Sequence, residues 1–153
     1  MNGAPPPPYN PTRVTRNGAA MTRYLALDVG DRRIGLAVAD DTFGIARPLS
    51  TIRRHDVEAD VRAVGKVVAE EEATALVIGL PLTLRGEEGL QAQRVRRFAD
   101  ACAPLGLPVE LYDERHTTTE AIRLGAPDVD AAAAALLLED YLSSLRRRTR
   151  REP

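Results

Sequence analysis

Three acidic residues at distant points of the chain have the character of ligands for a divalent metal ion. Asp28 ends an apolar run, Glu114 follows another, and Asp130 opens an alanine-rich segment. Since each lies where a predicted strand or helix begins or ends, folding can bring the three carboxylates together around Mg²⁺ or Mn²⁺. Both ions take oxygen ligands and are commonly held beside substrate phosphates. The pattern therefore points to phosphate chemistry.

Each of these acids also has an ordinary structural interpretation. Asp28 could accept backbone hydrogen bonds in an Asp-Val-Gly turn, and Glu114 could form a surface ion pair with a neighbouring arginine. Asp130 could be a helix N-cap, a role that Asp128 could fill equally well. The three acids together favour a metal site more than any one of them does.

Arginines and a glycine-rich loop offer contacts for a phosphate backbone. Residues 79–86 end a buried strand and lead into a helix, as phosphate-binding loops do, but they lack the Gly-Lys-Ser/Thr of a P-loop. Lys66 is the only lysine, and arginine suits bidentate phosphate contacts, although base composition of the gene could cause the same bias. The arginines that could form a basic rim are Arg32, Arg33, Arg85, Arg94, Arg97 and Arg115.

The two histidines and the single cysteine do not indicate a second site. His116 could orient water or contact phosphate, but a surface position explains it and the isolated His55 more simply. Cys102 recurs with apolar residues at helical spacing, which predicts burial. With one cysteine, a disulfide within the chain is impossible, and a reducing compartment is expected.

The composition is that of one compact domain. The chain has 153 residues, of which 44% are hydrophobic and 28% charged. No apolar run could cross a bilayer and no secretory signal is present, so we expect a soluble cytoplasmic protein. The formal net charge is -1, and nucleic-acid binding must therefore rest on a local basic patch.

Three regions are expected along the chain. Residues 1–20 contain a four-proline run and no apolar period, which predicts a disordered leader. Residues 21–148 form the folded domain, and residues 149–153 are a basic C-terminal tail.

Apolar periodicity predicts an α/β fold. Strands are expected at 24–28, 34–40, 45–52, 74–78 and 108–112, with helices at 57–68, 90–105 and 130–148. The first three strands form an antiparallel meander, in which Pro48 places the third near an edge or bulge. The later strands join by parallel crossovers. If the first, fourth and fifth strands are parallel, Asp28 and Glu114 emerge at one edge of the sheet.

Motifs along residues 22–145 together resemble the YqgF/RuvX family. They are Leu27-Asp-Val-Gly with Arg33-Ile-Gly-Leu-Ala, Gly79-Leu-Pro-Leu with Gly86, Asp113-Glu-Arg-His-Thr-Thr, and Val129-Asp-Ala-Ala ahead of a Leu-Leu-Leu-Glu-Asp-Tyr-Leu helix. The resemblance implies an RNase H-like fold with a mixed five-stranded sheet and helices on both faces, as in RuvC-type Holliday junction resolvases. It also implies the role proposed for that family, nucleolytic maturation of the 5′ end of pre-16S rRNA.

The resemblance also assigns residues. Asp28, Glu114 and Asp130 fall on the family's acidic triad, which implies binding of Mg²⁺ or Mn²⁺. Supporting motif positions are Arg33, Arg115 and Thr118. Thr117, a candidate cap for a helix running to residue 124, and Thr118 complete the candidate nucleic-acid-binding set.

Two departures from the family pattern are visible. His116 stands where the family usually has an apolar residue, which argues against its acting as a catalytic acid. Residues 124–129 are shorter than the basic segment that family members often carry there, so substrate contacts made by that segment do not transfer to this chain.

The expected activity is metal-dependent hydrolysis of phosphodiester bonds in structured nucleic acid, in precursor rRNA, branched DNA or both, with ribosomal particles as further candidate partners. A non-catalytic ribosome- or transcription-associated module is the alternative. An actin-like or sugar-kinase-like ATPase ranks lower, because such proteins use two such domains and would leave Glu114 and Asp130 unexplained. The sequence is compatible with endo- or exonuclease action, one or two metal ions, and a monomer or homodimer.

Overall fold

The computed structural model describes residues 21–41, 44–83, 85–114, 125 and 128–151. Along these residues the elements are β1 (Arg23–Val29), β2 (Arg33–Asp40), β3 (Arg47–Arg53), α1 (Val57–Glu71), β4 (Ala75–Pro81), α2 (Leu90–Ala101), the 3₁₀ turn η1 (Ala103–Leu105), β5 (Val109–Glu114) and α4 (Val129–Arg151). The predicted leader, residues 1–20, and the predicted helix after Thr117 lie outside the described residues.

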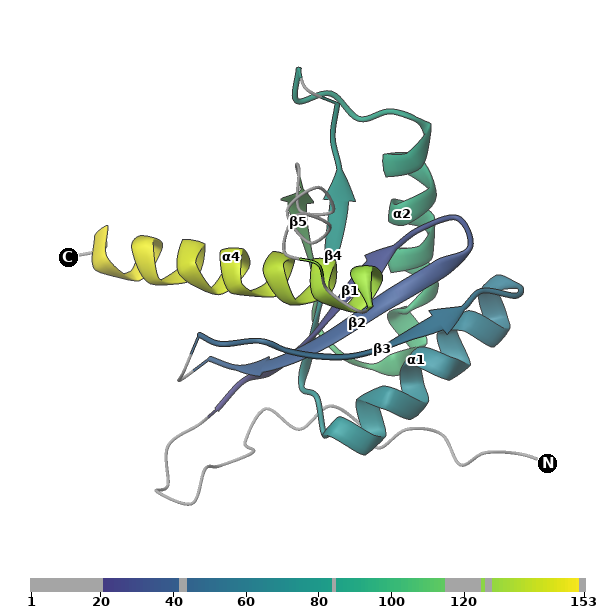
Figure 1. The fold of residues 1–153 in the computed structure, drawn as a ribbon, viewed down its shortest axis with the longest axis horizontal. Coiled ribbons are helices and arrows are strands. Elements are labelled where there is room, and N and C mark those ends of the chain that lie inside the picture. The colour runs from purple at the N-terminus through teal and green to yellow at the C-terminus, as the bar shows by residue number, and fades with distance from the viewer. Residues whose placement is uncertain (1–20, 42–43, 84, 115–124, 126–127, 152–153) are drawn as a thin grey trace.

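The strands form one sheet in the order β3-β2-β1-β4-β5. β1 pairs antiparallel with β2, and β2 with β3, whereas β4 runs parallel to both β1 and β5. Helices α1 and α2 cover one face and α4 crosses the other (Figure 1). The predicted α/β class, with a mixed five-stranded sheet and helices on both faces, is confirmed.

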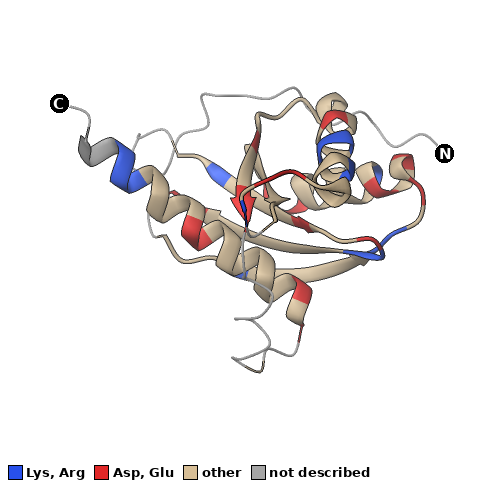
Figure 2. Cartoon of the chain, turned by 90° about the horizontal axis from the view of Figure 1, so that it is seen from above, with Lys and Arg blue, Asp and Glu red and all other residues tan. Residues whose placement is uncertain are grey.

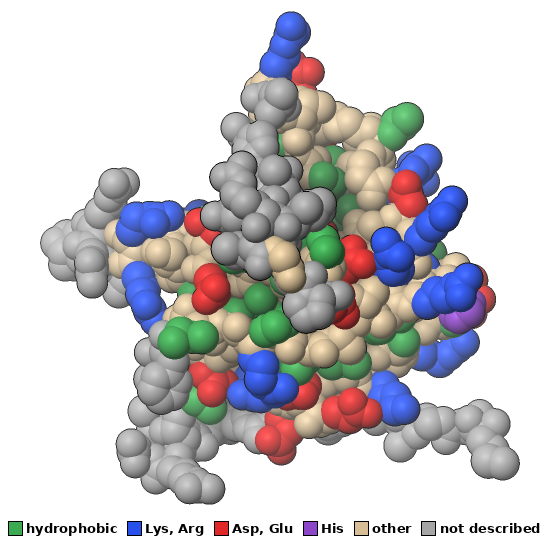
Figure 3. Space-filling model, viewed as in Figure 1, with side chains coloured by type: hydrophobic (Ala, Val, Ile, Leu, Met, Phe, Trp, Pro, Cys, Tyr) green, Lys and Arg blue, Asp and Glu red, His purple; other side chains and the backbone are tan. Residues whose placement is uncertain are grey.

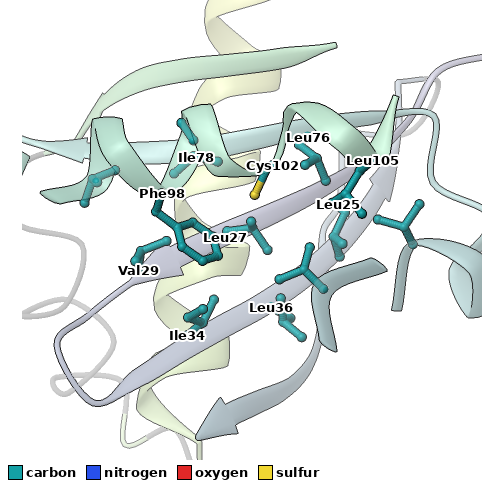
Figure 4. Packing of buried hydrophobic residues seen from close by; sticks show 14 of the residues in the cluster. Leu25, Leu27, Val29, Ile34, Leu36, Leu76, Ile78, Phe98, Cys102 and Leu105 are labelled. Atoms are coloured by element: carbon teal, nitrogen blue, oxygen red, sulfur yellow. The ribbon is translucent and has the colours of Figure 1, made fainter. Parts of the chain in front are cut away.

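Side chains alternate between the two faces, as the two-residue period of a strand requires. On β1, Leu25, Leu27 and Val29 pack beneath α1 and α2. Figure 4 shows these three with Phe98 and the buried Cys102 in that cluster. The intervening residues of β1 therefore face α4.

Several elements end later than their sequence pattern predicts. β4 continues through Gly79 to Pro81, because β5 keeps pairing with it up to Glu114. β5 consequently ends at Glu114 rather than at residue 112. The long pairing outweighs the weak strand preference of glycine, and proline is tolerated at a strand end, where its missing N–H is not needed.

Two helices also differ from expectation. α2 ends at Ala101 rather than at residue 105, and η1 follows it; Pro104 within η1 cannot continue an α-helix. α4 extends to Arg151 and so includes most of the predicted basic tail, residues 149–153. In the described part of the chain, no helix combines the length and apolar character needed to cross a membrane.

The edge position predicted from Pro48 is confirmed. β3 is an outer strand of the sheet, and its register with β2 shifts between Leu36 and Ala37, whose partners are Ser50 and Pro48. The shift is the bulge that a proline in a paired strand favours.

Candidate active site

The site is built on the face of the sheet that α4 covers. Ala26, Ala37 and Val77 pack against α4. By strict alternation, Asp28 on β1 points to the same face, and so do the positions of Gly35 on β2 and Gly79 on β4. The predicted acid of β1 and two glycines on its neighbouring strands therefore share one face near the carboxyl ends of β1 and β4.

Gly35 allows the first turn of α4 to approach the sheet closely. It is paired with Asp28 in the β1–β2 register. A Cβ atom built on Gly35 would overlap the backbone carbonyl of Asp130 and lie 3.0 Å from the amide nitrogen of Ala131. A side chain here would hold α4 away from β2. The glycine thus brings the backbone of Asp130 over the strand that flanks Asp28.

Asp128, not Asp130, caps α4. One carboxylate oxygen of Asp128 accepts a hydrogen bond from the amide of Ala131 at 3.0 Å and another from the hydroxyl of Thr51 at 2.7 Å. Of the two N-cap interpretations left open by the sequence, the structure selects Asp128. The carboxylate of Asp130 is consequently available for other contacts, and its Oδ2 lies 2.9 Å from Nε of Arg33.

Glu114 reaches the site across β4. A Cβ atom on Gly79 would overlap Oε2 of Glu114 and lie 3.2 Å from its Cδ, so the carboxylate of Glu114 occupies the space above this glycine. The register pairs Leu27 with Ile78, and the next step along both strands places Asp28 beside Gly79. There the side chains of Asp28 and Glu114 are hydrogen-bonded to each other.

The electrostatics of this cluster show in the pKa of Asp28, which is raised from 3.8 to about 7. Burial is the largest cause, followed by the negative charge of Glu114, that of Asp130, and the hydrogen bond to Glu114. Each cause disfavours a charged Asp28. The three predicted acids are therefore close enough to act on one another, and in the absence of a cation two of them share a proton near neutral pH.

The donors fit a hard divalent cation in kind, because carboxylate oxygens are the ligands that Mg²⁺ and Mn²⁺ prefer. Their mutual repulsion is what a bound cation would relieve. Within the described residues, however, no three side chains of His, Cys, Asp or Glu form a ready metal-binding group. Oδ2 of Asp130 is engaged by Arg33, so release from the guanidinium would free both oxygens of Asp130 for a cation.

The described arginines of the predicted basic rim are exposed, but not all are free of partners. Arg33 pairs with Asp130 and Arg94 with Asp31, at 3.3 Å, while Arg32, Arg85 and Arg97 point to solvent. Figure 3 shows Lys and Arg side chains along the side formed by α2 and the β1–β2 turn, and Figure 2 shows acidic residues at the start of α4 and basic ones near its end. The remaining candidates, Arg115, Thr117 and Thr118, lie outside the described residues, as does His116.

The glycine-rich loop after β4 is folded on itself. Thr83 donates its amide to the carbonyl of Glu87 at 2.9 Å, and Gly86 donates to the carbonyl of Thr83 at 2.8 Å. These N–H groups are therefore occupied, and the loop offers a phosphate fewer donors than a P-loop does. Arg85 in this loop remains exposed.

The sequence did not predict two residues that hydrogen-bond to the backbone directly after Asp28. Gln91 at the start of α2 donates its side-chain amide to the carbonyl of Val29 at 3.3 Å, and Arg54 donates to the carbonyl of Gly30 at 2.8 Å. The roles of Gly35 and Gly79 were also missed. The sequence did hold a signal for the two glycines: the two-residue alternation of their strands places both on the sheet face to which Asp28 points.

The chain is similar in sequence to members of one protein family. The RuvX family, described as Holliday junction resolvase, matches residues 22–144. A protein of Chloroflexus aggregans is 44% identical over 133 residues, which cover 80% of this chain and 94% of that protein. One of Anaeromyxobacter sp. (strain Fw109-5) is 44% identical over 131 residues, covering 78% and 96%. The names of both relatives propose a pre-16S rRNA nuclease.

Solved structures share the fold. Thermus thermophilus RuvC in complex with a Holliday junction substrate superposes with a TM-score of 0.55 at 18% identity, covering 82% of this chain and 96% of that one. Fowlpox virus resolvase in complex with Holliday junction DNA gives a TM-score of 0.53 at 11% identity, covering 81% and 99%. The RuvC-like fold expected from the sequence is confirmed, and with the family match over residues 22–144 this chain belongs to the RuvX family.

Proposed function

We propose that this chain is a metal-dependent nuclease in which Asp28, Glu114 and Asp130 are the catalytic carboxylates. The observation that carries the proposal is the state of Asp28. It lies at the end of a buried strand, hydrogen-bonded to Glu114 and repelled by Asp130, and its pKa is raised to about 7. A purely structural carboxylate in such a place is normally stabilised by donors or a cation, not by two further carboxylates.

The three acids would hold Mg²⁺ or Mn²⁺ with unequal roles. Asp28 stands between the other two, so it would be the shared ligand, flanked by Glu114 and Asp130. Asp130 would join by exchanging Arg33 for the cation. When bound, the cation supplies Lewis-acid stabilisation of the phosphate and an activated water.

A second group of residues would bind and position the nucleic acid. Arg32, Arg85, Arg94 and Arg97, with Arg33 once it leaves Asp130, would contact backbone phosphates, and Arg115, Thr117 and Thr118 complete this proposed set. Phosphate contacts fix the position of the backbone and weaken as salt rises, without reading sequence. The substrate would therefore be chosen by shape more than by base identity.

For the substrate we propose precursor 16S rRNA, cleaved near its 5′ end, in the cytoplasm and with ribosomal particles as partners. The support is the activity proposed in the names of relatives that are 44% identical. Branched DNA is the second substrate to test, since the two resolvases of similar fold were solved with Holliday junctions. The activity would reside in residues 21–148.

The test uses the purified protein and Asp28→Asn, each with Mn²⁺ or Mg²⁺ and with chelator. Substrates are a precursor 16S rRNA fragment, an unstructured single-stranded RNA and a synthetic four-way DNA junction. We expect metal-dependent cleavage of the precursor that Asp28→Asn lowers by a factor of at least about 10³, the loss seen when a catalytic group is removed. Equal cleavage by both proteins would reveal a contaminant, and binding without cleavage of every substrate would identify a non-catalytic module.

A further inference from the structure

The position of Glu114 relative to Asp28 depends on a residue that carries no functional group. β1 and β5 are not neighbours in the sheet, because β4 lies between them. The strand pairing places Asp28 beside Gly79 and Glu114 beside Pro81, two residues further along β4. With strands about 4.8 Å apart and a rise of about 3.3 Å per residue, the two backbones lie about 12 Å apart. Their side chains nevertheless meet in a hydrogen bond, so one carboxylate must lie over the middle strand.

The residue of β4 beneath that carboxylate is Gly79. A Cβ atom there would overlap Oε2 of Glu114 and lie 3.2 Å from its Cδ and 3.1 Å from Cδ2 of Leu137 on α4. Gly79 is not among the glycines with positive φ, so its backbone does not require glycine. What requires glycine at this position is the space above it.

We propose that Gly79 is a positioning residue for the carboxylate site: by leaving the middle strand bare, it lets Glu114 lie across β4 and reach Asp28. The inference rests on the proposed function only for its consequence, metal binding. Even alanine at this position would fill the place of the Glu114 carboxylate.

Gly79→Ala is a mild change for the fold and a severe one for the site. The atom that must move first is the end of a glutamate side chain, which can rotate away without disturbing a strand. The contact with Leu137 needs a shift of a few tenths of an ångström at most. We therefore expect a folded protein in which Glu114 has turned away from Asp28.

Gly65→Ala in α1 is the matched control. Its Cβ would lie 2.9 Å from Cδ2 of Leu105, so it crowds one buried leucine as Gly79→Ala does, but away from the carboxylates. If crowding were the whole effect, the two variants would behave alike in every measurement.

The first measurement is Mn²⁺ affinity by titration calorimetry for wild type, Gly79→Ala, Gly65→Ala, Glu114→Gln and the double variant Gly79→Ala/Glu114→Gln. We expect Gly79→Ala to weaken binding by about 10- to 100-fold, as removal of a residue that orients a ligand does. Glu114→Gln should weaken it similarly, and the double variant no further, since both changes remove the same ligand. Wild-type affinity in Gly79→Ala, or additive losses in the double variant, would overturn the proposal.

The second measurement is a crystal structure of metal-free Gly79→Ala, which does not depend on metal binding. The proposal predicts an unchanged sheet with the Glu114 carboxylate displaced from Asp28. A structure in which Glu114 stays in place while β4 shifts would refute it. If wild type and Glu114→Gln bound Mn²⁺ equally, the proposed function would fail, while this structure would still decide the role of Gly79.

Discussion

The side chains of Asp28 and Glu114 are hydrogen-bonded to each other although strand β4 separates the strands that carry them. Two carboxyl groups can share a hydrogen bond only if one of them holds a proton. Because the pKa of Asp28 is raised to about 7, the pair keeps this proton up to near-neutral pH in the absence of a cation. A metal ion bound at the proposed site would displace this proton.

The first prediction concerns the stability of the metal-free protein. Because the pKa of Asp28 is higher in the folded state, about 7, than its ordinary value of 3.8, the folded state binds this proton more tightly. The resulting stabilisation is complete below pH 3.8 and is lost as pH rises through about 7. In EDTA, the Tm of wild type should therefore fall between pH 5 and pH 8.5 relative to that of Asp28→Asn, which cannot ionise.

The expected relative fall is on the order of 10 °C. Each pH unit between pH 5 and about 7 removes about 1.4 kcal/mol, and about 1 kcal/mol shifts the Tm of a domain of this size by several degrees. Differential scanning calorimetry of both proteins across the pH range measures it. Mn²⁺ at pH 8.5 should raise the Tm of wild type more than that of the variant. Parallel Tm profiles for the two proteins would show that Asp28 does not titrate as described.

The second prediction concerns Arg33, which is paired with Asp130. Arg33→Gln should tighten Mn²⁺ binding a few-fold, because Asp130 is released and a positive charge leaves the site; the exposure of Arg33 keeps the effect small. The same change should weaken nucleic-acid binding. It should also make the slope of log affinity against log salt concentration shallower by about 1, the contribution of one phosphate contact.

Arg32→Gln is the control for this prediction. Arg32 is exposed, and its side chain makes no ion pair within the described part of the structure. It should weaken nucleic-acid binding without changing Mn²⁺ affinity. Calorimetry and filter binding at several salt concentrations separate the two effects. Tighter Mn²⁺ binding in both variants would mean that general charge, not release of Asp130, is responsible.

The third prediction concerns a buried ion pair between Arg54, which follows β3, and Asp60 of α1, on the face of the sheet opposite the carboxylates. Asp60 is 1% exposed and accepts hydrogen bonds from Nε of Arg54 at 3.1 Å and from the amide of His55 at 2.8 Å. Asp60→Ala leaves the guanidinium of Arg54 unpaired in a largely buried place, which should cost about 3–5 kcal/mol in the free energy of unfolding. Urea denaturation measures this loss.

Asp56→Ala provides the comparison. Asp56 is the exposed N-cap of α1, the helix that contains Asp60, and its carboxylate accepts a hydrogen bond from the amide of Ala59 at 2.8 Å. Loss of this cap should cost only about 1 kcal/mol. The two variants would contradict the prediction if they lost stability equally.

The fourth prediction concerns Cys102, which is buried and whose pKa is raised by burial to about 11. Since only the thiolate reacts, a thiol reagent at pH 8 should modify the native protein very slowly and the urea-unfolded protein quickly. Rapid modification of the native protein would place Cys102 at the surface. A spectrophotometric thiol assay with and without urea decides between the two.

Much of the sheet was predictable, because local patterns specify it. Apolar runs predicted the five strands and the change from antiparallel to parallel strands along the chain. The proline in β3 predicted its place near an edge or bulge, and the helical stripe predicted that Cys102 is buried. Element ends were less predictable. β4 passes through Gly79 to Pro81 because β5 pairs with it, and pairing with a strand some thirty residues away leaves no local signal.

The candidate site was predictable as a set of residue types but not as a geometry. Sequence could name Asp28, Glu114 and Asp130, and it left the cap of α4 open between Asp128 and Asp130. The choice of Asp128 depends on the hydroxyl of Thr51 in β3, a tertiary contact. The pairing of Arg33 with Asp130 and the bare surface above Gly79 likewise depend on how α4 and β4 pack.

The most direct test of the central claim, that three carboxylates share one cation site, is Mn²⁺ affinity across single-site variants. Asp28→Asn, Glu114→Gln and Asp130→Asn each remove one proposed ligand, and Asp113→Asn is the control, because Asp113 is an exposed neighbour of Glu114 on the opposite strand face. We predict that each of the first three weakens binding at least about tenfold and that Asp113→Asn does not. Wild-type affinity in any of the three, or an equal loss in the control, would contradict the account.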